Sequence, residues 1–299
     1  MKKSAMFFRH EEGKIRCYLC PHYCLIEKNH MGFCGVRECS EAEGGLKLFT
    51  LNYGEITSIA LDAVKKKPLY HFYPDGNILS IGTFGCNFKC SFCQNYSISQ
   101  YRPESQYVPA EEMADISLKN EGSIGLAFTY NEPSIWYEYV YDVAREIKSR
   151  NKEHKIVLVT NGYINQEPLK QLLPYVDAMN IDLKGDEEFY TNICLGKMEP
   201  VMDTIRLADK EGCHIEVTTL LIPGENNSYE TLDRLGKFLE SVNNDIVLHV
   251  SRFFPRYRMK KQATDIEEMK KAYRQLKTRL NNVYAGNISN EEMAYITKQ

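Results

Sequence analysis

Apolar runs rich in β-branched residues alternate with amphipathic segments of helical period over most of this chain. Six runs have the length and composition of buried strands, at 78–83, 123–130, 155–161, 177–183, 214–222 and 245–251. The amphipathic segments lie at 109–120, 133–150, 166–174, 199–211, 228–242 and 264–282. Strands and helices that alternate in this way form a parallel sheet with right-handed crossovers. We therefore predict an α/β fold, and the periodicity is compatible with an open doubly wound sheet or with a full or partial β/α barrel.

Polar motifs stand directly after five of these strands. They are a three-cysteine loop, TYNEP at 129–133, TNG at 160–162, DLKG at 182–185 and PGEN at 223–226. In a parallel α/β fold, the loops that follow the strands share one edge of the sheet. The sequence therefore predicts a functional site at the carboxyl-terminal edge.

The first of these motifs, GTFGCNFKCSFCQN at 82–95, places Cys86, Cys90 and Cys93 within eight positions. Deprotonated cysteines are soft ligands for zinc or for iron–sulfur clusters. A [4Fe–4S] cube held by three protein thiolates leaves one iron without a protein ligand, and a substrate or cofactor can bind there. The alternatives are a zinc site with a distant fourth ligand, and buried structural cysteines.

Residues 1–50 form a cysteine-rich segment that we predict to be a small metal-binding domain, with 51–299 as the α/β domain. Four cysteines have spacings that can close a four-thiolate site: Cys17, Cys20, Cys24 and Cys34. Cys39, His22 or His30 can replace one of these ligands. A segment with little core of its own gains stability from such a site. The candidates are zinc, a second [4Fe–4S] cluster, or cysteines that carry no metal and only pack.

Charge and cysteine usage restrict the partners and the compartment. The net charge is −3 and the pI is about 6.2, so we see no clear signature of nucleic-acid binding. No apolar run reaches the roughly 20 residues of a membrane span, and the amino-terminal residues do not form a signal peptide. Closely spaced cysteines in a cytoplasmic protein are more often metal ligands or catalytic groups than disulfides. We expect a cytoplasmic protein with no membrane partner.

The spacing C-x3-C-x-aromatic-C after the first barrel strand resembles the signature of radical S-adenosylmethionine (SAM) enzymes. This resemblance implies a partial (β/α)6 TIM-like barrel with a small Cys-rich amino-terminal domain. It further implies a [4Fe–4S] cluster on Cys86, Cys90 and Cys93, whose open iron is chelated by the amino and carboxylate groups of SAM. The reduced cluster then cleaves SAM, and the 5′-deoxyadenosyl radical removes a hydrogen atom from a substrate.

The resemblance also implies contacts to SAM. The residues that match or lie near the cofactor segments are Phe92, Gln94, Asn131, Glu132, Thr160, Asn161, Asp182, Lys184, His249 and Arg252. Asp182 and Lys184 point to one side of an extended strand and resemble the pair that binds the amino-acid end of SAM in pyruvate formate-lyase activating enzymes. Those enzymes have Asp before TNG, where this chain has Val159. The alternatives are a surface ion pair for Asp182 and Lys184 and a buried, backbone-bonded His249.

Two further phrases, CYLCPHYC with GFCGVR and KKPLYHFYPD, resemble the radical SAM member of the AmmeMemoRadiSam group. That group is related to activating enzymes and is named for its association with Memo-like and AMMECR-like proteins, which are candidate partners. An electron donor such as flavodoxin or ferredoxin is implied as well. We expect an activating enzyme that installs a glycyl radical on a partner protein, or radical modification of a small molecule, a peptide or an RNA nucleoside. A non-catalytic metal-cluster scaffold is the remaining hypothesis.

Overall fold

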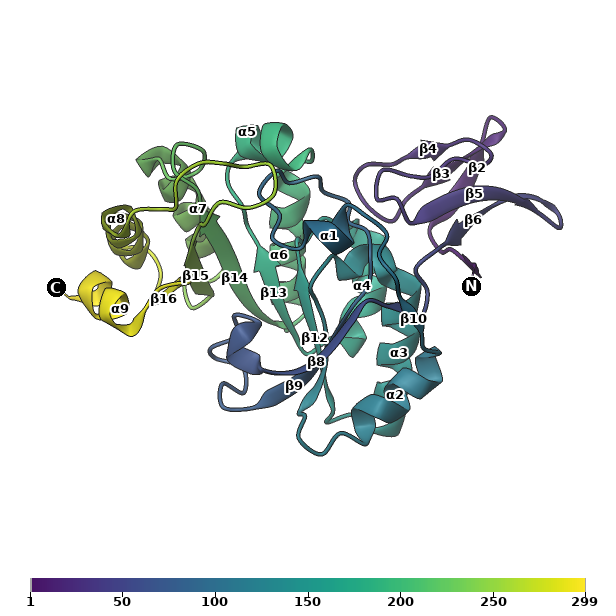
Figure 1. Ribbon diagram of the computed structural model, residues 1–299, viewed down its shortest axis with the longest axis horizontal. Helices are drawn as coiled ribbons and strands as arrows, with labels where there is room; N and C mark the ends of the chain where they lie inside the picture. The colour runs from purple at the N-terminus through teal and green to yellow at the C-terminus, as the bar shows by residue number, and fades with distance from the viewer. Residues whose placement is uncertain (1, 299) are drawn as a thin grey trace.

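The computed structural model describes residues 2–298, which are organised around one eight-stranded sheet (Figure 1). Its strands are β8 (Ser58–Ala63), β9 (Asn77–Gly82), β11 (Gly125–Phe128), β12 (Lys155–Thr160), β13 (Ala178–Asp182), β14 (His214–Leu221), β15 (Val247–Arg252) and β16 (Asn282–Gly286). Their order is β16-β15-β14-β13-β12-β11-β9-β8. All neighbours from β9 to β16 are parallel, and β8 is antiparallel to β9. Because β8 and β16 are the two edges and do not pair with each other, the sheet does not close into a full barrel.

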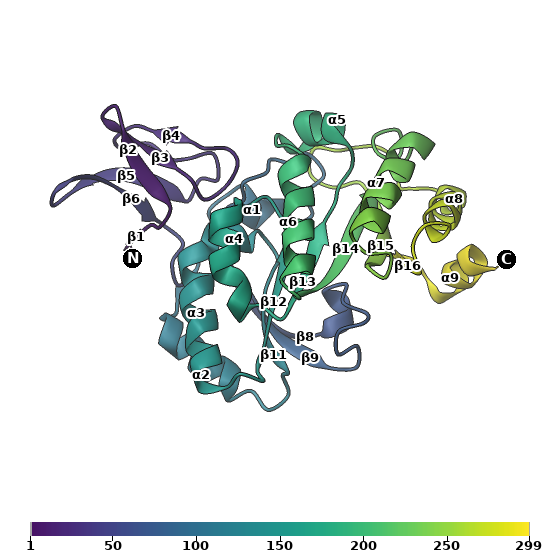
Figure 2. The same cartoon turned by 180° about the vertical axis from the view of Figure 1, so that it is seen from behind.

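Helices connect the parallel strands, as the alternating pattern predicts. They are α2 (Ala110–Leu118), α3 (Tyr137–Arg150), α4 (Gln166–Leu172), α6 (Glu199–Lys210), α7 (Tyr229–Val242), α8 (Ile266–Lys277) and α9 (Asn290–Thr297). Figure 2 shows α3, α4, α6 and α7 side by side across one face of the sheet. Each packs its apolar stripe on that face, and the strands are buried on both sides. None of the helices within residues 2–298 combines the length and the apolar character of a membrane span.

The other face of the sheet is covered by the segment between β8 and β9. Val64, Leu69 and Phe72 pack on Ile78 of β9 and on an apolar layer that also includes Ala127, Val157 and Ala178. We call residues 64–72 the floor segment. It covers the amino-terminal half of the strands, so the carboxyl-terminal edge is left to the polar loops.

The predicted α/β fold and partial barrel are confirmed, with one addition. The segment 264–282 is helical only to Lys277, and the chain then forms β16 as a seventh parallel strand. Only Val283 and Ala285 of β16 are buried. An edge strand with two apolar side chains gives too short a pattern to be recognised beside the longer buried runs.

The amino-terminal residues form two small antiparallel sheets beside the barrel (Figure 1). One contains β1 (Lys3–Ser4), β6 (Gly45–Thr50) and β5 (Arg37–Ala42), and the other β2 (Phe8–Glu11), β3 (Lys14–Cys17) and β4 (Leu25–Ile26). The short strands β7 (Glu55–Ile56) and β10 (Gln106–Tyr107) pair with each other. The last amino-terminal strand ends at Thr50, and the division into domains at this point stays a prediction.

Candidate active site

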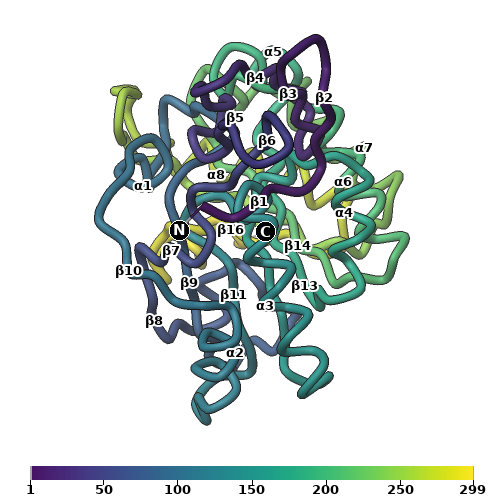
Figure 3. Tube along the Cα trace, turned by 90° about the vertical axis from the view of Figure 1, so that its right-hand side faces the viewer, coloured from purple at the N-terminus to yellow at the C-terminus, as the bar shows by residue number. Residues whose placement is uncertain are grey.

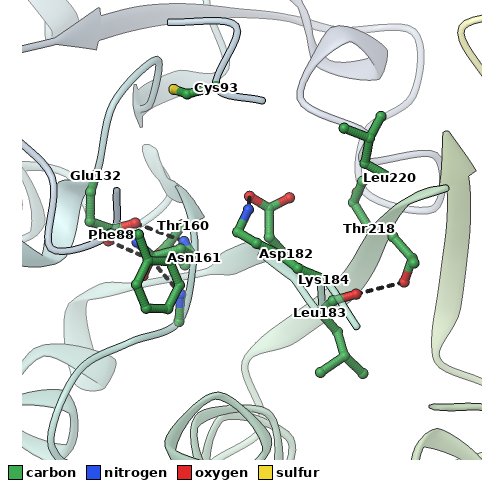
Figure 4. Close-up of polar contacts among 12 residues, drawn as sticks. Phe88, Cys93, Glu132, Thr160, Asn161, Asp182, Leu183, Lys184, Thr218 and Leu220 are labelled. Carbon is green, nitrogen blue, oxygen red and sulfur yellow. Dashed lines mark hydrogen bonds and ion pairs between the residues drawn. The ribbon is translucent and has the colours of Figure 1, made fainter. Parts of the chain in front are cut away.

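Four of the polar loops meet at the carboxyl-terminal edge of the sheet (Figure 4). The three-cysteine loop follows β9, TYNEP follows β11, and TNG begins at Thr160, the last residue of β12. Asp182 is the last residue of β13, and Lys184 lies two positions beyond it. Parallel strands bring these loops together although up to about a hundred residues separate them in the chain.

Hydrogen-bonding groups contact two of the three sulfurs in the first loop. Phe88 N donates to Cys86 Sγ at 3.3 Å, and Asn161 Nδ2 lies 3.7 Å from the same sulfur. The hydroxyl of Ser99, in the short helix α1 (Tyr96–Ser99), is 3.2 Å from Cys93 Sγ. All ten cysteines are free thiols. The loop therefore presents three unbridged sulfurs with polar groups directed at two of them.

Burial alone disfavours thiolates in this loop. It raises the pKa of Cys86 and of Cys93, and for Cys90 the neighbouring Cys194 thiol and burial both raise the pKa. Among residues 2–298, no group of three or more His, Cys, Asp and Glu side chains could hold a single metal ion. A mononuclear site needs every sulfur about 2.3 Å from one point, whereas a cube bonds each cysteine to a different iron. Three thiols in one loop are one short of a closed mononuclear site and match a cube with one open iron.

Glu132 is buried, and its carboxylate binds groups of this chain. Its Oε1 accepts hydrogen bonds from Ser134 N at 2.8 Å and Thr160 Oγ1 at 2.7 Å, and its Oε2 accepts one from Asn161 N at 2.7 Å. Glu132 is also the N-cap of the 3-10 turn Pro133–Trp136. The structure therefore brings Glu132, Thr160 and Asn161 together, with the carboxylate orienting the TNG loop.

Asn131 links the TYNEP loop to the cysteine loop. Its Oδ1 accepts from Thr83 N at 3.2 Å, and its Nδ2 donates to Gly85 O at 3.0 Å. Gly85 has φ +91°, and a Cβ there would lie 2.5 Å from Val36 Cγ1. The turn that starts the cysteine loop thus requires glycine for its backbone conformation and for a close contact with the amino-terminal sheets.

Asp182 and Lys184 form an ion pair that faces the cysteine loop (Figure 4). The distance from Lys184 Nζ to Asp182 Oδ2 is 2.7 Å, and Nζ lies 5.9 Å from the ring centre of Phe92. Burial opposes the charge of Lys184, but the Asp182 carboxylate outweighs burial and holds the pKa of Lys184 well above its ordinary value. The lysine therefore stays charged inside the site, with Leu183 turned to the other side and buried.

The remaining candidates of the cysteine loop lie on either side of Cys93. Phe92 is buried and packs on Phe189, with ring centres 5.8 Å apart. Gln94 is exposed, and within the described residues its side chain has no hydrogen bond. Phe92 therefore borders the ion pair, whereas Gln94 is free to bind a ligand.

His249 and Arg252 are not brought to this group of loops. His249 is buried, and its Nε2 lies 2.6 Å from Glu216 Oε2. Glu216 also accepts hydrogen bonds from the backbone N–H groups of Tyr70 and His71, both in the floor segment. Arg252 donates to Thr264 O at 2.7 Å and pairs with Glu292 at 2.8 Å, near the carboxyl-terminal helix. Neither residue contacts the other candidates, because their side chains are bound elsewhere.

The four amino-terminal cysteines converge. Cys17, Cys20, Cys24 and Cys34 line one small enclosed cavity, together with His22 and Arg37. Phe33 N lies 3.4 Å from Cys24 Sγ, and Arg37 lies 3.8 Å from Cys17 Sγ. Cys39 and His30 do not line this cavity, and the His30 ring is bonded to Lys28 O. The group of candidate ligands is thus reduced to four thiols, with His22 at the edge.

Sequence reasoning missed three polar groups that support the site. Asn87 is buried and bridges two loops, because its Oδ1 accepts from Asn161 Nδ2 and its Nδ2 donates to Tyr163 O. Ser99 binds Cys93, and Cys194 lies beside Cys90. Only Asn87 had a local signal, as an amide directly after a cysteine. Ser99 and Cys194 reach the loop through tertiary packing that no short motif records.

Comparison with known proteins agrees with this arrangement. A family model described as the radical SAM superfamily matches residues 80–236, slightly more than half of the chain. An uncharacterized protein of Methanocaldococcus jannaschii is 38% identical over 300 residues, covering 97% of this chain and 86% of that protein. The pyruvate formate-lyase-activating enzyme of Staphylococcus epidermidis is 21% identical over 173 residues, covering 54% of this chain and 68% of that enzyme.

A solved structure shares the fold. It is a radical SAM methyltransferase from Sphaerobacter thermophilus, with a TM-score of 0.57 at 16% identity, covering 72% of this chain and 67% of that chain.

Proposed function

Because the chain belongs to the radical SAM superfamily and is related to pyruvate formate-lyase activating enzymes, we propose that Cys86, Cys90 and Cys93 hold its [4Fe–4S] cluster. The observation that carries the proposal is the three-thiol loop facing the partly buried Asp182–Lys184 pair. Three free sulfurs with polar donors nearby fit a cube with one open iron. When bound and reduced, such a cluster would supply the one electron that splits SAM into methionine and a 5′-deoxyadenosyl radical, and this radical would take a hydrogen atom from the substrate.

The protein's own residues bind and orient SAM in this proposal. SAM ends in an ammonium and a carboxylate, so it needs neighbouring groups of both charges. Asp182 accepts hydrogen bonds from the ammonium, and Lys184 donates to the carboxylate. Phe92 and Gln94 border the cofactor beside Cys93. The backbone N–H of Asn161 donates to Glu132, which orients the loop. Glu132, Asn131 and Thr160 are positioning residues here, since their polar atoms are bound within the chain.

The test uses protein reconstituted with iron and sulfide without oxygen. With dithionite and SAM, the wild type should release 5′-deoxyadenosine, and Cys93→Ala should release none because the cluster is not retained. Cys213→Ala, which changes a buried cysteine far from the loop, is the matched control. Release of 5′-deoxyadenosine by Cys93→Ala at the wild-type rate would rule out the proposed ligand set.

We propose a glycine of a partner protein as the hydrogen donor, which the relation to activating enzymes supports. A lysate of the source organism grown on α-deuterated glycine should transfer deuterium into the 5′-deoxyadenosine. Product formation without deuterium would instead point to the alternative, a small molecule, a peptide or an RNA nucleoside. Memo-like and AMMECR-like partners, a protein electron donor and a cytoplasmic location remain parts of this proposal.

We also propose that Cys17, Cys20, Cys24 and Cys34 form a second metal site. Four thiols that line one cavity support this proposal. The nearby Arg37 guanidinium also supports it, because its positive charge stabilises negatively charged thiolates. Within residues 2–298 these four sulfurs are not arranged around one point as a bound ion would need, so the proposal stands on the donor type, which suits zinc or a [4Fe–4S] cluster. Metal analysis of the Cys86→Ala/Cys90→Ala/Cys93→Ala variant distinguishes the two. A zinc site should retain about one equivalent of zinc per chain, and a [4Fe–4S] cluster about four equivalents of iron. If the variant contained neither zinc nor iron, the proposal of a second metal site would be contradicted.

A further inference from the structure

After β15, the chain crosses back over the barrel edge to the cysteine loop. Residues 253–264, which we call the strap, connect β15 to α8. The N–H groups of Arg258 and Met259 both donate to Ser91 O at 3.0 Å. Ser91 stands between Cys90 and Phe92 in the sequence. In Figure 3 the strap, yellow-green by residue number, projects beside α1. The backbone of the strap is therefore fixed directly on the loop that carries the proposed cluster.

An aromatic contact fixes the strap from a second side. Tyr257 stacks on Tyr96 of α1, with ring centres 4.7 Å apart and planes 12° apart. Tyr257 has φ +52°, a conformation that non-glycine residues rarely adopt. The guanidinium of Arg258 lies 4.9 Å from the Tyr257 ring centre. The strap backbone is thus anchored to residues on both sides of Cys93 in the sequence, Ser91 and Tyr96.

The strap and the neighbouring residues 94–103 form a basic surface on an acidic protein. Together the two segments contain Arg102, Arg256, Arg258, Lys260 and Lys261, and an acidic residue directly follows each segment, Glu104 and Asp265. The whole chain has a net charge of −3. Lys261 pairs with Glu225 at 2.6 Å. Arg256, Arg258 and Lys260 are exposed, and within residues 2–298 none of the three has a carboxylate partner.

Resting on the function proposed above, we propose that this basic surface docks an acidic electron-carrier protein, with flavodoxin as the type. The cluster must receive one electron for each SAM cleaved. In the docked pair, an anionic flavin hydroquinone loses one electron and becomes the neutral semiquinone, and the oxidised cluster gains that electron. No bond is formed or broken, and no proton is transferred.

Two observations favour an electron carrier over a nucleic acid. The cations are confined to segments in contact with the cysteine loop, and electron transfer requires a partner close to the cluster. A nucleic acid backbone is bound by a longer series of cations that follow its phosphates. Small, charged and transient interfaces are typical of electron-transfer pairs. A local positive surface also steers an acidic partner toward a protein whose net charge would otherwise repel it.

The test compares two charge reversals of equal size. Arg256→Glu/Lys260→Glu changes the strap, and Lys152→Glu/Lys210→Glu changes two exposed lysines after α3 and at the end of α6. Stopped-flow absorbance follows cluster reduction by flavodoxin hydroquinone, and calorimetry measures binding of oxidised flavodoxin. We expect the strap variant to be reduced about tenfold more slowly at low salt, with a matching loss of affinity, and the difference to shrink at about 0.5 M salt. The control variant should react like the wild type.

Reduction by dithionite separates this proposal from the one it rests on. Dithionite needs no docking surface, so both variants should be reduced by it, and form 5′-deoxyadenosine, as the wild type does. Flavodoxin reduction of the strap variant at the wild-type rate would overturn the docking proposal. The docking proposal would also be overturned if the strap variant kept its binding of flavodoxin and lost its binding of a single-stranded oligoribonucleotide. Failure of the wild type to cleave SAM with dithionite would count against the proposed function alone.

Discussion

Two charged side chains at the site, the buried Glu132 and the partly buried Lys184, have different roles, which their hydrogen bonds distinguish. Glu132 gives both carboxylate oxygens to donors of its own chain, whereas Lys184 makes one ion pair and reaches the cysteine loop. The sequence places both residues directly after strands, but it does not say whether a polar group binds a ligand or a loop. That distinction depends on Thr160 and Asn161, which lie 28 and 29 residues from Glu132.

Glu132→Gln should destabilise the protein by about 1–3 kcal/mol, because one oxygen becomes an amide that cannot accept the hydrogen bond now made to the carboxylate. Urea unfolding of the cluster-free protein measures the change in free energy of unfolding. Glu188→Gln, an exposed position in the short helix α5 (Glu187–Phe189), is the control and should have no effect. A Glu132→Gln protein with wild-type stability and lost SAM binding would show that Glu132 contacts SAM.

At the scale of elements, the strands could be predicted and the floor segment could not. The strands are buried on both faces, so each is a continuous apolar run that stands out in the sequence. The floor segment has irregular structure, and its partner Glu216 lies about 145 residues away in the chain. Glu216 also binds the His249 ring. His249 therefore lies beside the floor segment, although its strand β15 ends at the carboxyl-terminal edge of the sheet.

Acid should weaken the contact between the floor segment and β14. Four donors, the His214 and His249 rings and the backbone N–H groups of Tyr70 and His71, outweigh the effect of burial and lower the pKa of Glu216 to about 2. A carboxyl with a depressed pKa in the folded state contributes stability above its unfolded pKa of 4.5, and this contribution is lost as the pH falls toward 2.

Between pH 6 and pH 4, the wild type should therefore lose about 1 kcal/mol more of its free energy of unfolding than Glu216→Gln. Urea unfolding at the two pH values measures both proteins, and the other titrating groups cancel in the comparison except His214 and His249, which contact Glu216. Equal pH dependence would show that the Glu216 carboxylate does not have the depressed pKa.

At the scale of the whole molecule, one buried ion pair joins the amino-terminal sheets to the barrel. Arg37 of β5 pairs with Glu138 of α3, and their side chains are 1% and 3% exposed. Arg37 also donates to Met6 O at 2.8 Å, and Met6 N donates to Glu138 Oε1 at 2.7 Å. Arg37 Nε and Glu138 Oε2 have no partner. The contact therefore fixes the four-cysteine region against the barrel through an incompletely satisfied pair.

Replacing one member of this pair should cost more than replacing both. Arg37→Met leaves a buried carboxylate without its counter-charge, which costs about 3–5 kcal/mol. Arg37→Met/Glu138→Met removes both charges, so its loss should be smaller than the sum of the two single losses and close to the cost of repacking. Urea unfolding of the four proteins gives the coupling energy. Additive losses would mean that the two side chains do not interact, and that the amino-terminal sheets are held to the barrel by apolar packing instead.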